Sequence, residues 1–201
     1  MMKKQVLKLL KTSFNIFISI LFISMAACSE SEYSKLIKTE IAKEIVHDSI
    51  FLGLKFGQTN QEFFAICMKL NQDEIVTNGG VKMSVKYILP TKKGDDTKYA
   101  TTMHFYGIFN KEKIMTGMDM QFSYNAWSLW NKSLQSDQLI HAVKDTLRSW
   151  YPGNDFLKVE MKKNKGNIFV KIDGNRRIII KPIDDNKSVK VLIDDLRTAL
   201  D

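Results

Sequence analysis

Residues 99–124, YATTMHFYGIFNKEKIMTGMDMQFSY, contain the pattern that decides the fold. Two runs of strand-forming residues, YATTMHFYGIF and IMTGMDMQFSY, flank the polar segment NKEK at positions 110–113. Polar residues of this kind favour turns, because Asn side chains can hydrogen-bond to nearby backbone groups. The stretch therefore predicts an antiparallel β-hairpin with its turn at residues 110–113.

A helix and a further strand are predicted before this hairpin. FLGLKFG, from residue 51, reads as an extended segment that turns at Gly57. Thr59 and Glu62 have the spacing of a capping box, in which each side chain accepts from the other residue's backbone amide at a helix start. After the turn at residues 78–80, VKMSVKYIL at 81–89 alternates apolar and polar residues, which predicts a strand.

A second helix and about four strands are predicted after the hairpin. Ser136 is expected to cap this helix, with Asp137 favourable near its positive end. Pro152 and Gly153 are expected to end it. Four strands follow in the sequence, namely FLKVEM (156–161), NIFVKI (167–172), RRIIIKPI (176–183) and SVKVLID (188–194), with turns at 173–175 and 184–187.

This order predicts an α+β fold made of two tandem units, each a helix with antiparallel strands. The units span residues 51–131 and 132–201, and their helices are expected to pack on one face of the sheet or sheets. The sequence leaves open whether the two units share one sheet.

The first 50 residues predict an exported, lipid-anchored protein. Four lysines precede an apolar run at 14–27, the layout of a secretory signal over residues 1–27. The following segment, residues 28–50, is expected to form a tether. Residues 36–46 have roughly helical apolar spacing, which fits either a docking helix or part of that tether.

The end of the apolar run, Met25-Ala26-Ala27-Cys28, resembles the lipobox of bacterial lipoproteins. This resemblance implies cleavage after Ala27 and acylation of Cys28, for example with palmitate. The alternative is an ordinary secreted protein cut near Ala27. Residue 29 is Ser and not Asp, so the outer membrane is expected more than the inner one.

The charge of the chain bears on whether it binds nucleic acid. The full chain has 30 basic and 22 acidic residues, a formal charge of +8. Without the four lysines of the leader, 26 basic residues stand against 22 acidic ones, a charge of +4. This excess is too small to indicate a nucleic-acid partner.

Several phrases resemble a family of uncharacterised bacterial envelope lipoproteins, namely LGLKFG, QEFF and KIDGNRRIII, over residues 50–195. The order of elements is also similar to that of beta-lactamase-inhibitor-like proteins and of the small lipoprotein of the outer-membrane assembly machine. These resemblances imply a fold and an envelope location. They imply no established activity.

The sequence predicts no catalytic group, metal ion or cofactor. His47, His104 and His141 are scattered, and no Cys or His pair has a zinc-like spacing. His104, in a predicted strand, and His141, beside the apolar stripe of a predicted helix, are interpreted as structural. Cys67 is expected to be a buried apolar side chain. The acidic doublets at 95–96, 184–185 and 194–195 are interpreted as solvated turn residues.

Aromatic residues between and after the two units form a candidate interaction surface. Its members are Tyr124, Trp127, Trp130, Trp150 and Tyr151. Such side chains can bind sugars or anchor a protein partner. The alternative is that they fill the seam between the two units. Basic residues could form a patch for anionic lipid or an acidic partner, or simply solvated faces, at Lys162, Lys163, Lys165, Arg176 and Arg177.

Taken together, these features predict a lipid-anchored envelope protein that binds a protein or a glycan and is not an enzyme. An inhibitor of an envelope hydrolase is a variant of this hypothesis. The alternative is a glycan hydrolase, which needs two carboxylates across a cleft. Four are available without a spacing that selects a pair: Asp119, Asp155, Glu160 and Asp173.

Overall fold

The computed structural model of the chain describes residues 30–80, 84–91, 94, 96–160, 167–183 and 185–199. In this part of the chain the fold is α+β, with four α-helices and a large antiparallel sheet of eight strands. The α+β class predicted from the sequence is therefore confirmed. The chain divides into two compact units, Met1–Lys35 and Leu36–Asp201. The sheet belongs entirely to the second unit.

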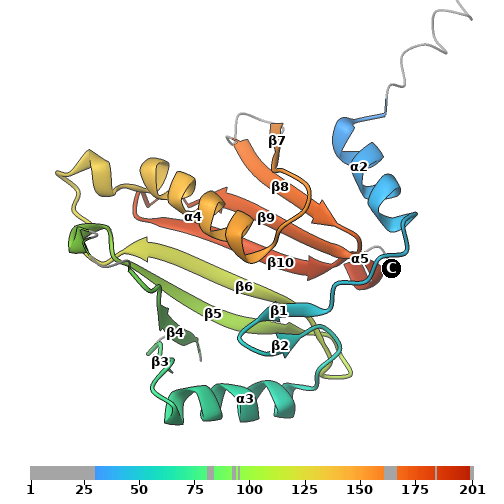
Figure 1. Cartoon of the computed structure of the whole chain (residues 1–201), viewed down its shortest axis with the longest axis horizontal. Helices are drawn as coiled ribbons and strands as arrows, with labels where there is room; N and C mark the ends of the chain where they lie inside the picture. Colours follow the sequence, from blue (N-terminus) through green and yellow to red (C-terminus); the bar gives the residue numbers. More distant parts are fainter. Residues whose placement is uncertain are drawn as a thin grey trace, which may run out of the picture. The chain divides into compact units, whose positions relative to one another are not determined.

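The two long helices, the hairpin and the last four strands follow one another in the predicted order, and the chain also forms short elements that the sequence did not predict (Figure 1). The helices are α2 (Glu32–Ile41), α3 (Asn60–Gln72), α4 (Ser136–Trp150) and α5 (Leu196–Ala199). The strands of the first half are β1 (Ser49–Phe51), β2 (Leu54–Lys55), β3 (Thr77–Asn78), β4 (Val85–Ile88), β5 (Thr101–Phe109) and β6 (Met115–Tyr124). Those of the second half are β7 (Leu157–Glu160), β8 (Asn167–Asp173), β9 (Arg176–Pro182) and β10 (Ser188–Asp195). Two short 3-10 helices cover Thr97–Tyr99 and Lys132–Leu134.

One sheet contains the strands of both halves, which answers the question that the sequence left open. Its order is β3-β4-β5-β6-β10-β9-β8-β7, and β1 pairs separately with β2. The halves meet where β6 and β10 lie side by side and antiparallel, with Met120 opposite Val191 (Figure 1). Each half therefore contributes its last strand to the centre of the sheet.

The predicted hairpin at residues 99–124 is confirmed as β5 and β6. Its turn is closed by Asn110, whose Oδ1 accepts a hydrogen bond from the Ile114 amide at 2.9 Å. Lys113 takes a left-handed backbone conformation with φ of 62°. The Asn side chain thus supplies the turn geometry that the sequence suggested.

The two long helices begin differently. The Thr59 hydroxyl accepts from the Glu62 amide, and the Glu62 carboxylate accepts from the Thr59 amide, which confirms the capping box of α3. The predicted Ser136 cap of α4 is wrong, because Gln135 occupies the cap position and makes no side-chain capping bond. Ser136 is buried instead, and its amide donates to the Asn186 carbonyl at 2.9 Å. A tertiary contact with the β9–β10 turn therefore sets the start of this helix.

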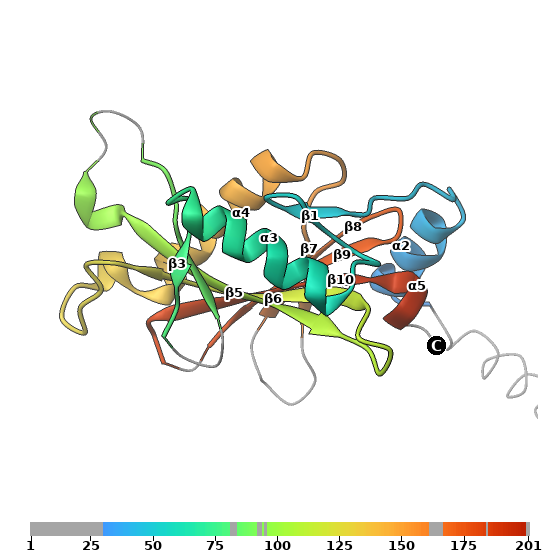
Figure 2. The same cartoon turned by 90° about the horizontal axis from the view of Figure 1, so that it is seen from below.

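The core is formed by alternate residues of the strands together with apolar residues of α3 and α4. In Figure 2, α3 runs alongside β5, with which it is in contact, while α4 contacts β6, β9 and β10. Members of this core include Phe63, Cys67, Met103, Phe105, Met118, Met120, Phe122, Leu139, Val143, Leu147, Ile178, Ile180, Val189, Val191 and Ile193. Cys67 is buried as predicted, and this burial raises the pKa of its thiol to about 11.

Side chains alternate across a strand, so the residues between these core positions point to the opposite face of the sheet. In the central strands that face is mostly polar. We call it the polar face and define it by Thr102, His104, Tyr106, Asp119, Gln121, Ser123 and Lys190. The strand register places His104 opposite Gln121, and Tyr106 opposite Asp119.

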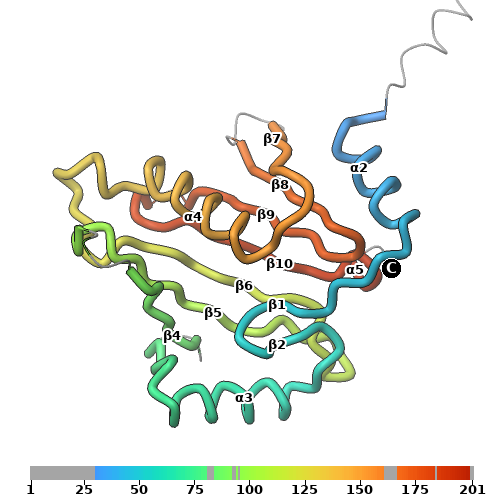
Figure 3. Tube along the Cα trace, in the orientation of Figure 1, coloured from blue at the N-terminus to red at the C-terminus, as the bar shows by residue number. Residues whose placement is uncertain are grey.

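A buried polar cluster holds the β8–β9 turn against the chain before β1. The Gly174 amide donates to Glu40 Oε2 at 3.1 Å, and the His47 amide donates to Asn175 Oδ1 at 2.6 Å. Figure 3 shows the segment between α2 and β1 passing this turn. The sequence pattern of residues 36–46 fits either a docking helix or part of a tether. In the structure residues 36–41 are helical, and Glu40 accepts a hydrogen bond from Gly174 in the β8–β9 turn.

Candidate functional site

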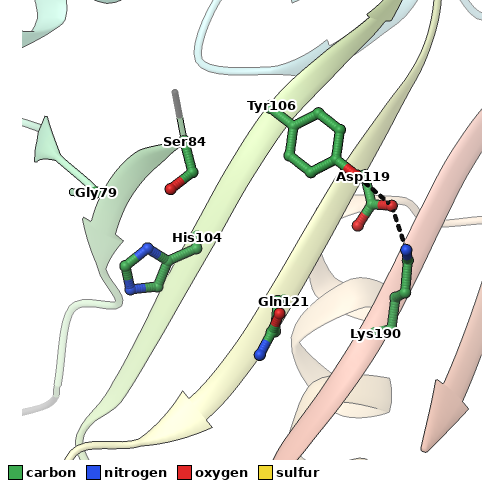
Figure 4. A pocket seen from close by; sticks show the side chains of 7 residues that line it. All are labelled: Gly79, Ser84, His104, Tyr106, Asp119, Gln121 and Lys190. Atoms are coloured by element: carbon green, nitrogen blue, oxygen red, sulfur yellow. Dashed lines mark hydrogen bonds and ion pairs between the residues drawn. The ribbon is translucent and has the colours of Figure 1, made fainter. Parts of the chain in front are cut away.

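A hollow of about 360 Å³ lies on the polar face and is the best candidate for a site. Strands β5, β6 and β10 provide its floor, and Gly79 and Ser84 provide one wall (Figure 4). The lining residues are Gly79, Ser84, His104, Tyr106, Asp119, Gln121 and Lys190. We call this the first hollow.

Three of these side chains form a charge-neutral group. The Tyr106 hydroxyl donates to Asp119 Oδ2 at 3.0 Å, and Lys190 Nζ lies 2.5 Å from the same oxygen (Figure 4). The hydrogen bond to Asp119 raises the pKa of Lys190, so this amine stays protonated. Burial and then the contact with Asp119 raise the pKa of the Tyr106 hydroxyl. Neither group is therefore activated as a base or nucleophile near neutral pH.

The wall of the first hollow depends on a glycine. A Cβ atom at Gly79 would lie 2.3 Å from Ser84 Oγ and 3.0 Å from His104 Nδ1. Both distances are too short for carbon against these atoms. The absence of a side chain at position 79 therefore lets this segment approach the two polar groups closely.

A second hollow of about 230 Å³ adjoins the first and shares His104 with it. Its lining residues are Lys86, Thr102, His104, Ser123, Tyr124, Asn125, Trp127 and Lys187. Burial lowers the pKa of His104 below its ordinary value of 6.5, and the charges of Lys86 and Lys187 lower it further. The imidazole is therefore neutral at pH values of about 7.

The structure does not bring the five predicted aromatic residues together on one surface. Tyr124 and Tyr151 are buried, at 6% and 4% exposure, and the Tyr151 hydroxyl donates to the Ile50 carbonyl at 2.7 Å. Trp150 is half-buried against Phe51, with ring centroids 4.9 Å apart. These three side chains belong to the hydrophobic core or pack against it.

The remaining two members, Trp127 and Trp130, reach the surface. Trp127 lines the second hollow, and its indole N–H donates to the Asn186 carbonyl at 3.2 Å. Trp130 is 90% exposed. The loop between β6 and α4 therefore offers two separate aromatic contacts.

The four carboxylates considered for a hydrolase lie in separate surroundings. Of the four, the first hollow contains Asp119 alone. Asp155 is exposed and lies 2.8 Å from Arg148, whereas Asp173 is buried and lies 2.8 Å from Lys171. Glu160 is exposed on β7. The sheet thus does not pair any two of them across the first hollow.

Other residues singled out in the sequence do not line the two hollows or lie beyond the described chain. Arg176 is buried, with its guanidinium 4.6 Å from the Tyr151 ring, and Arg177 pairs with Asp194. The lipobox residues Met25, Ala26, Ala27 and Cys28 lie outside the described residues, as do Asp95, Lys162, Lys163, Lys165 and Asp184. Among the described residues, no group of three or more His, Cys, Asp or Glu side chains is placed to hold a metal ion.

No helix within the described ranges has the length and apolarity needed to cross a membrane.

The sequence pattern does not identify most of the polar face. It favours a structural role for His104 and does not single out Tyr106, Gln121 or Lys190. A signal was present, because Thr102, His104 and Tyr106 alternate with buried residues, as do Asp119, Gln121 and Ser123. What the sequence alone did not provide was the pairing of β6 with β10, which brings Lys190 to Asp119.

Comparison with known protein families, with curated proteins and with solved structures finds no match to this chain.

Proposed function

We propose that this protein is a lipid-anchored cell-envelope protein that binds a partner on the polar face of its sheet and catalyses no reaction. The observation that carries this proposal is that two hollows with polar linings lie side by side at His104, which lines both. Together they present hydroxyl, amide, imidazole and ammonium groups along one face. Convergent polar groups in a concave surface are typical of a ligand site.

The charges in the first hollow favour binding over catalysis. Asp119 is held by Lys190 and Tyr106, so its negative charge is compensated before any ligand arrives. A hydrolase of glycans would use a second carboxylate facing the first, at about 5 to 10 Å. The first hollow supplies a compensated acid and several hydrogen-bond donors instead, which suits recognition.

The partner is a glycan or a protein, and different residues favour each. Trp127 beside hydroxyl and amide groups suits a sugar ring. The 90% exposure of Trp130 suits a protein partner, because tryptophan is enriched at the energetic centres of protein interfaces. The second hollow contains hydroxyl and amide groups beside Trp127, whereas Trp130 does not line it, so we favour the glycan.

A pull-down from solubilised envelope with the full-length protein tests this function. We expect Tyr106→Ala combined with Gln121→Ala to lose the captured partner, because both side chains are exposed on the polar face. The matched control Lys158→Ala changes an exposed residue of β7 and should capture as the wild type does. Equal capture by both variants contradicts the proposal. Loss on Trp130→Ala alone would instead locate a protein interface in the loop after β6.

Anchoring is a separate part of the proposal and has its own test. We propose cleavage after Ala27, acylation of Cys28 and, in view of Ser29, residence at the outer membrane. Cys28→Ala should abolish incorporation of labelled palmitate and move the protein out of the membrane fraction. Ser29→Ala is the control and should remain in the membrane. A Cys28→Ala protein that stays labelled and membrane-bound contradicts acylation at this residue.

We also propose that the sheet arose as two tandem units, 51–131 and 132–201, with the helices of both on the face opposite the polar face. The strand order supports this, because each half places a helix before a run of four strands and ends at the centre of the sheet. The apolar residues of α3 and α4 in one core also support it. The family resemblances noted from the sequence remain predictions.

A further inference from the structure

We propose that the second hollow binds the acidic group, carboxylate or sulfate, of an acidic saccharide. This inference rests on the proposed function, because it takes the polar face to be the binding surface. It adds the chemical class of the ligand and the residues that select it.

Charge is the first argument. Lys86 of β4 and Lys187 of the β9–β10 turn line the second hollow, and no acidic residue among its described lining opposes them. Asp185, the acidic residue of this turn that the structure describes, does not line the hollow, and its carboxylate accepts from the amides of Lys187 and Ser188 at 2.9 and 2.8 Å. Asp119, in the first hollow, is compensated by Lys190. The second hollow is therefore a place of positive potential, which an anion would occupy favourably.

His104 lies between the charged groups of the two hollows. Its side chain lines both hollows, and the charged groups around it are Lys86, Lys187 and, in the first hollow, the Asp119–Lys190 pair. Burial lowers the pKa of His104, and the charges of Lys86 and Lys187 lower it further. An anion placed between these groups would reverse that effect and favour the protonated imidazole.

The polar groups beside the lysines are arranged for hydrogen bonding to a sugar. Thr102 donates its hydroxyl hydrogen to Asn125 Oδ1 at 2.5 Å. The amide oxygen of Asn125 is thus engaged by Thr102. The NH2 group of Asn125 is the group that can donate a hydrogen bond to a ligand. Ser123 adds a hydroxyl to the same hollow.

Trp127 argues for a saccharide over an acidic peptide. Its ring is fixed by the bond to the Asn186 carbonyl, and Lys187 Nζ lies 5.4 Å from the ring centroid. A fixed indole next to an ammonium group can contact the apolar side of a sugar while the lysine meets its acidic substituent. An extended acidic peptide would need a row of cations, whereas this hollow of about 230 Å³ is lined by two lysines, of which Lys187 lies over the Trp127 ring.

Calorimetric titration of the full-length protein tests the inference with charge-matched probes. The acidic probes are tetragalacturonate, which carries only carboxylates, and a κ-carrageenan tetrasaccharide, which carries only sulfates, so that together they distinguish carboxylate from sulfate. The neutral control is the methyl ester of tetragalacturonate, and tetraglutamate represents an acidic peptide. We expect at least one acidic saccharide to bind about tenfold or more tightly than the ester and the peptide, with affinity falling as salt rises.

Variants locate the binding. Lys86→Met and Lys187→Met should each weaken the acidic saccharide about tenfold and leave the ester unchanged, because both residues line the hollow. Lys158→Met on β7 is the matched control and should bind as the wild type does. Nuclear magnetic resonance should also show the bound saccharide raising the pKa of His104, a shift that a merely structural role for the lysines would not produce.

Three results would overturn the inference. They are equal binding of ester and acid, preference for tetraglutamate, and failure of both acidic saccharides to bind or to move the His104 resonance. In each case the pull-down with the Tyr106→Ala and Gln121→Ala variant still decides the proposed function. Loss of capture in that variant would leave the polar face as the binding surface with a different ligand class.

Discussion

At the scale of single residues, Lys171 stands out as a charge inside the protein. Its side chain is 1% exposed, and its ammonium group donates to the Asn154 carbonyl and lies 2.8 Å from Asp173 Oδ2. The Asp173 carboxylate also accepts from the Asn154 amide at 2.7 Å. Burying two charges is unfavourable unless both are well paired, so each depends on the other.

Lys171→Met should therefore destabilise the protein by about 3 to 5 kcal/mol, because the buried Asp173 carboxylate would lose its closer cation and keep only Arg176, whose Nη2 lies 4.0 Å from Oδ2. Adding Asp173→Asn should recover part of this loss, since it removes the stranded charge. Urea denaturation measures both variants. Lys158→Met, on the exposed side of β7, is the control and should change stability by less than about 0.5 kcal/mol. A loss of the same size in the control would contradict the argument from burial.

Gly174 in the β8–β9 turn is a second residue whose substitution should destabilise the protein. Its φ is 55°, and a Cβ there would lie 2.1 Å from the Ile45 carbonyl oxygen. Gly57 has φ of 80° but open space around it, so it serves as the matched control. Gly57→Ala should cost about 1 kcal/mol from backbone strain alone. Gly174→Ala should cost clearly more, because the clash adds to the strain, and thermal unfolding compares the two. Equal losses would show that the close approach to Ile45 is unimportant.

His104 predicts a pH dependence of stability. Its pKa is lowered in the folded chain, so the unfolded chain binds more protons once the pH falls towards 6.5. The stability that this group contributes is thus fully present above that pH and is lost as the pH falls through it. Between about pH 7.5 and about pH 5, the wild type should lose more stability than His104→Gln. His141→Gln, exposed on α4, is the control and should keep the wild-type slope. Equal slopes in wild type and His104→Gln would refute this origin.

At the scale of elements, the start of α3 is set by a local interaction, the capping box of Thr59 and Glu62. Thr59→Ala removes one half of the capping box and should destabilise the protein by about 0.5 to 2 kcal/mol. Thr59→Ser keeps the hydroxyl and should lose much less. Chemical denaturation of the two variants tests this. A Ser variant as unstable as the Ala variant would mean that the methyl group of Thr59, and not the capping bond, matters.

The contrast between α3 and α4 shows what could be predicted from the sequence. The capping box and the β5–β6 turn use residues a few positions apart, so their patterns are visible in the chain, and both predictions are confirmed. The start of α4 depends on Asn186, which is far away in sequence, and the Ser136 prediction failed there. For the same reason the site was missed, since Lys190 meets Asp119 only through strand pairing.

At the scale of the whole molecule, the single sheet predicts cooperative unfolding. Residues of both halves share one core, and β6 and β10 pair along most of their length. We therefore expect one transition in which tryptophan fluorescence and far-ultraviolet circular dichroism coincide. Two separated transitions would contradict this and would mean that the halves unfold independently.

The central position of β10 also fixes the order in which the molecule can be completed. The hairpin of β5 and β6 can form as soon as residue 124 is available. The second partner of β6, strand β10, becomes available only after residues 125–187. Until then β6 presents a ten-residue edge rich in methionine and aromatic side chains. Such an edge is a template for wrong pairing with other chains. A chain released from synthesis or transport with its N-terminus first would therefore pass through a half-built state, and its yield should depend on how quickly the last strand reaches the middle of the sheet.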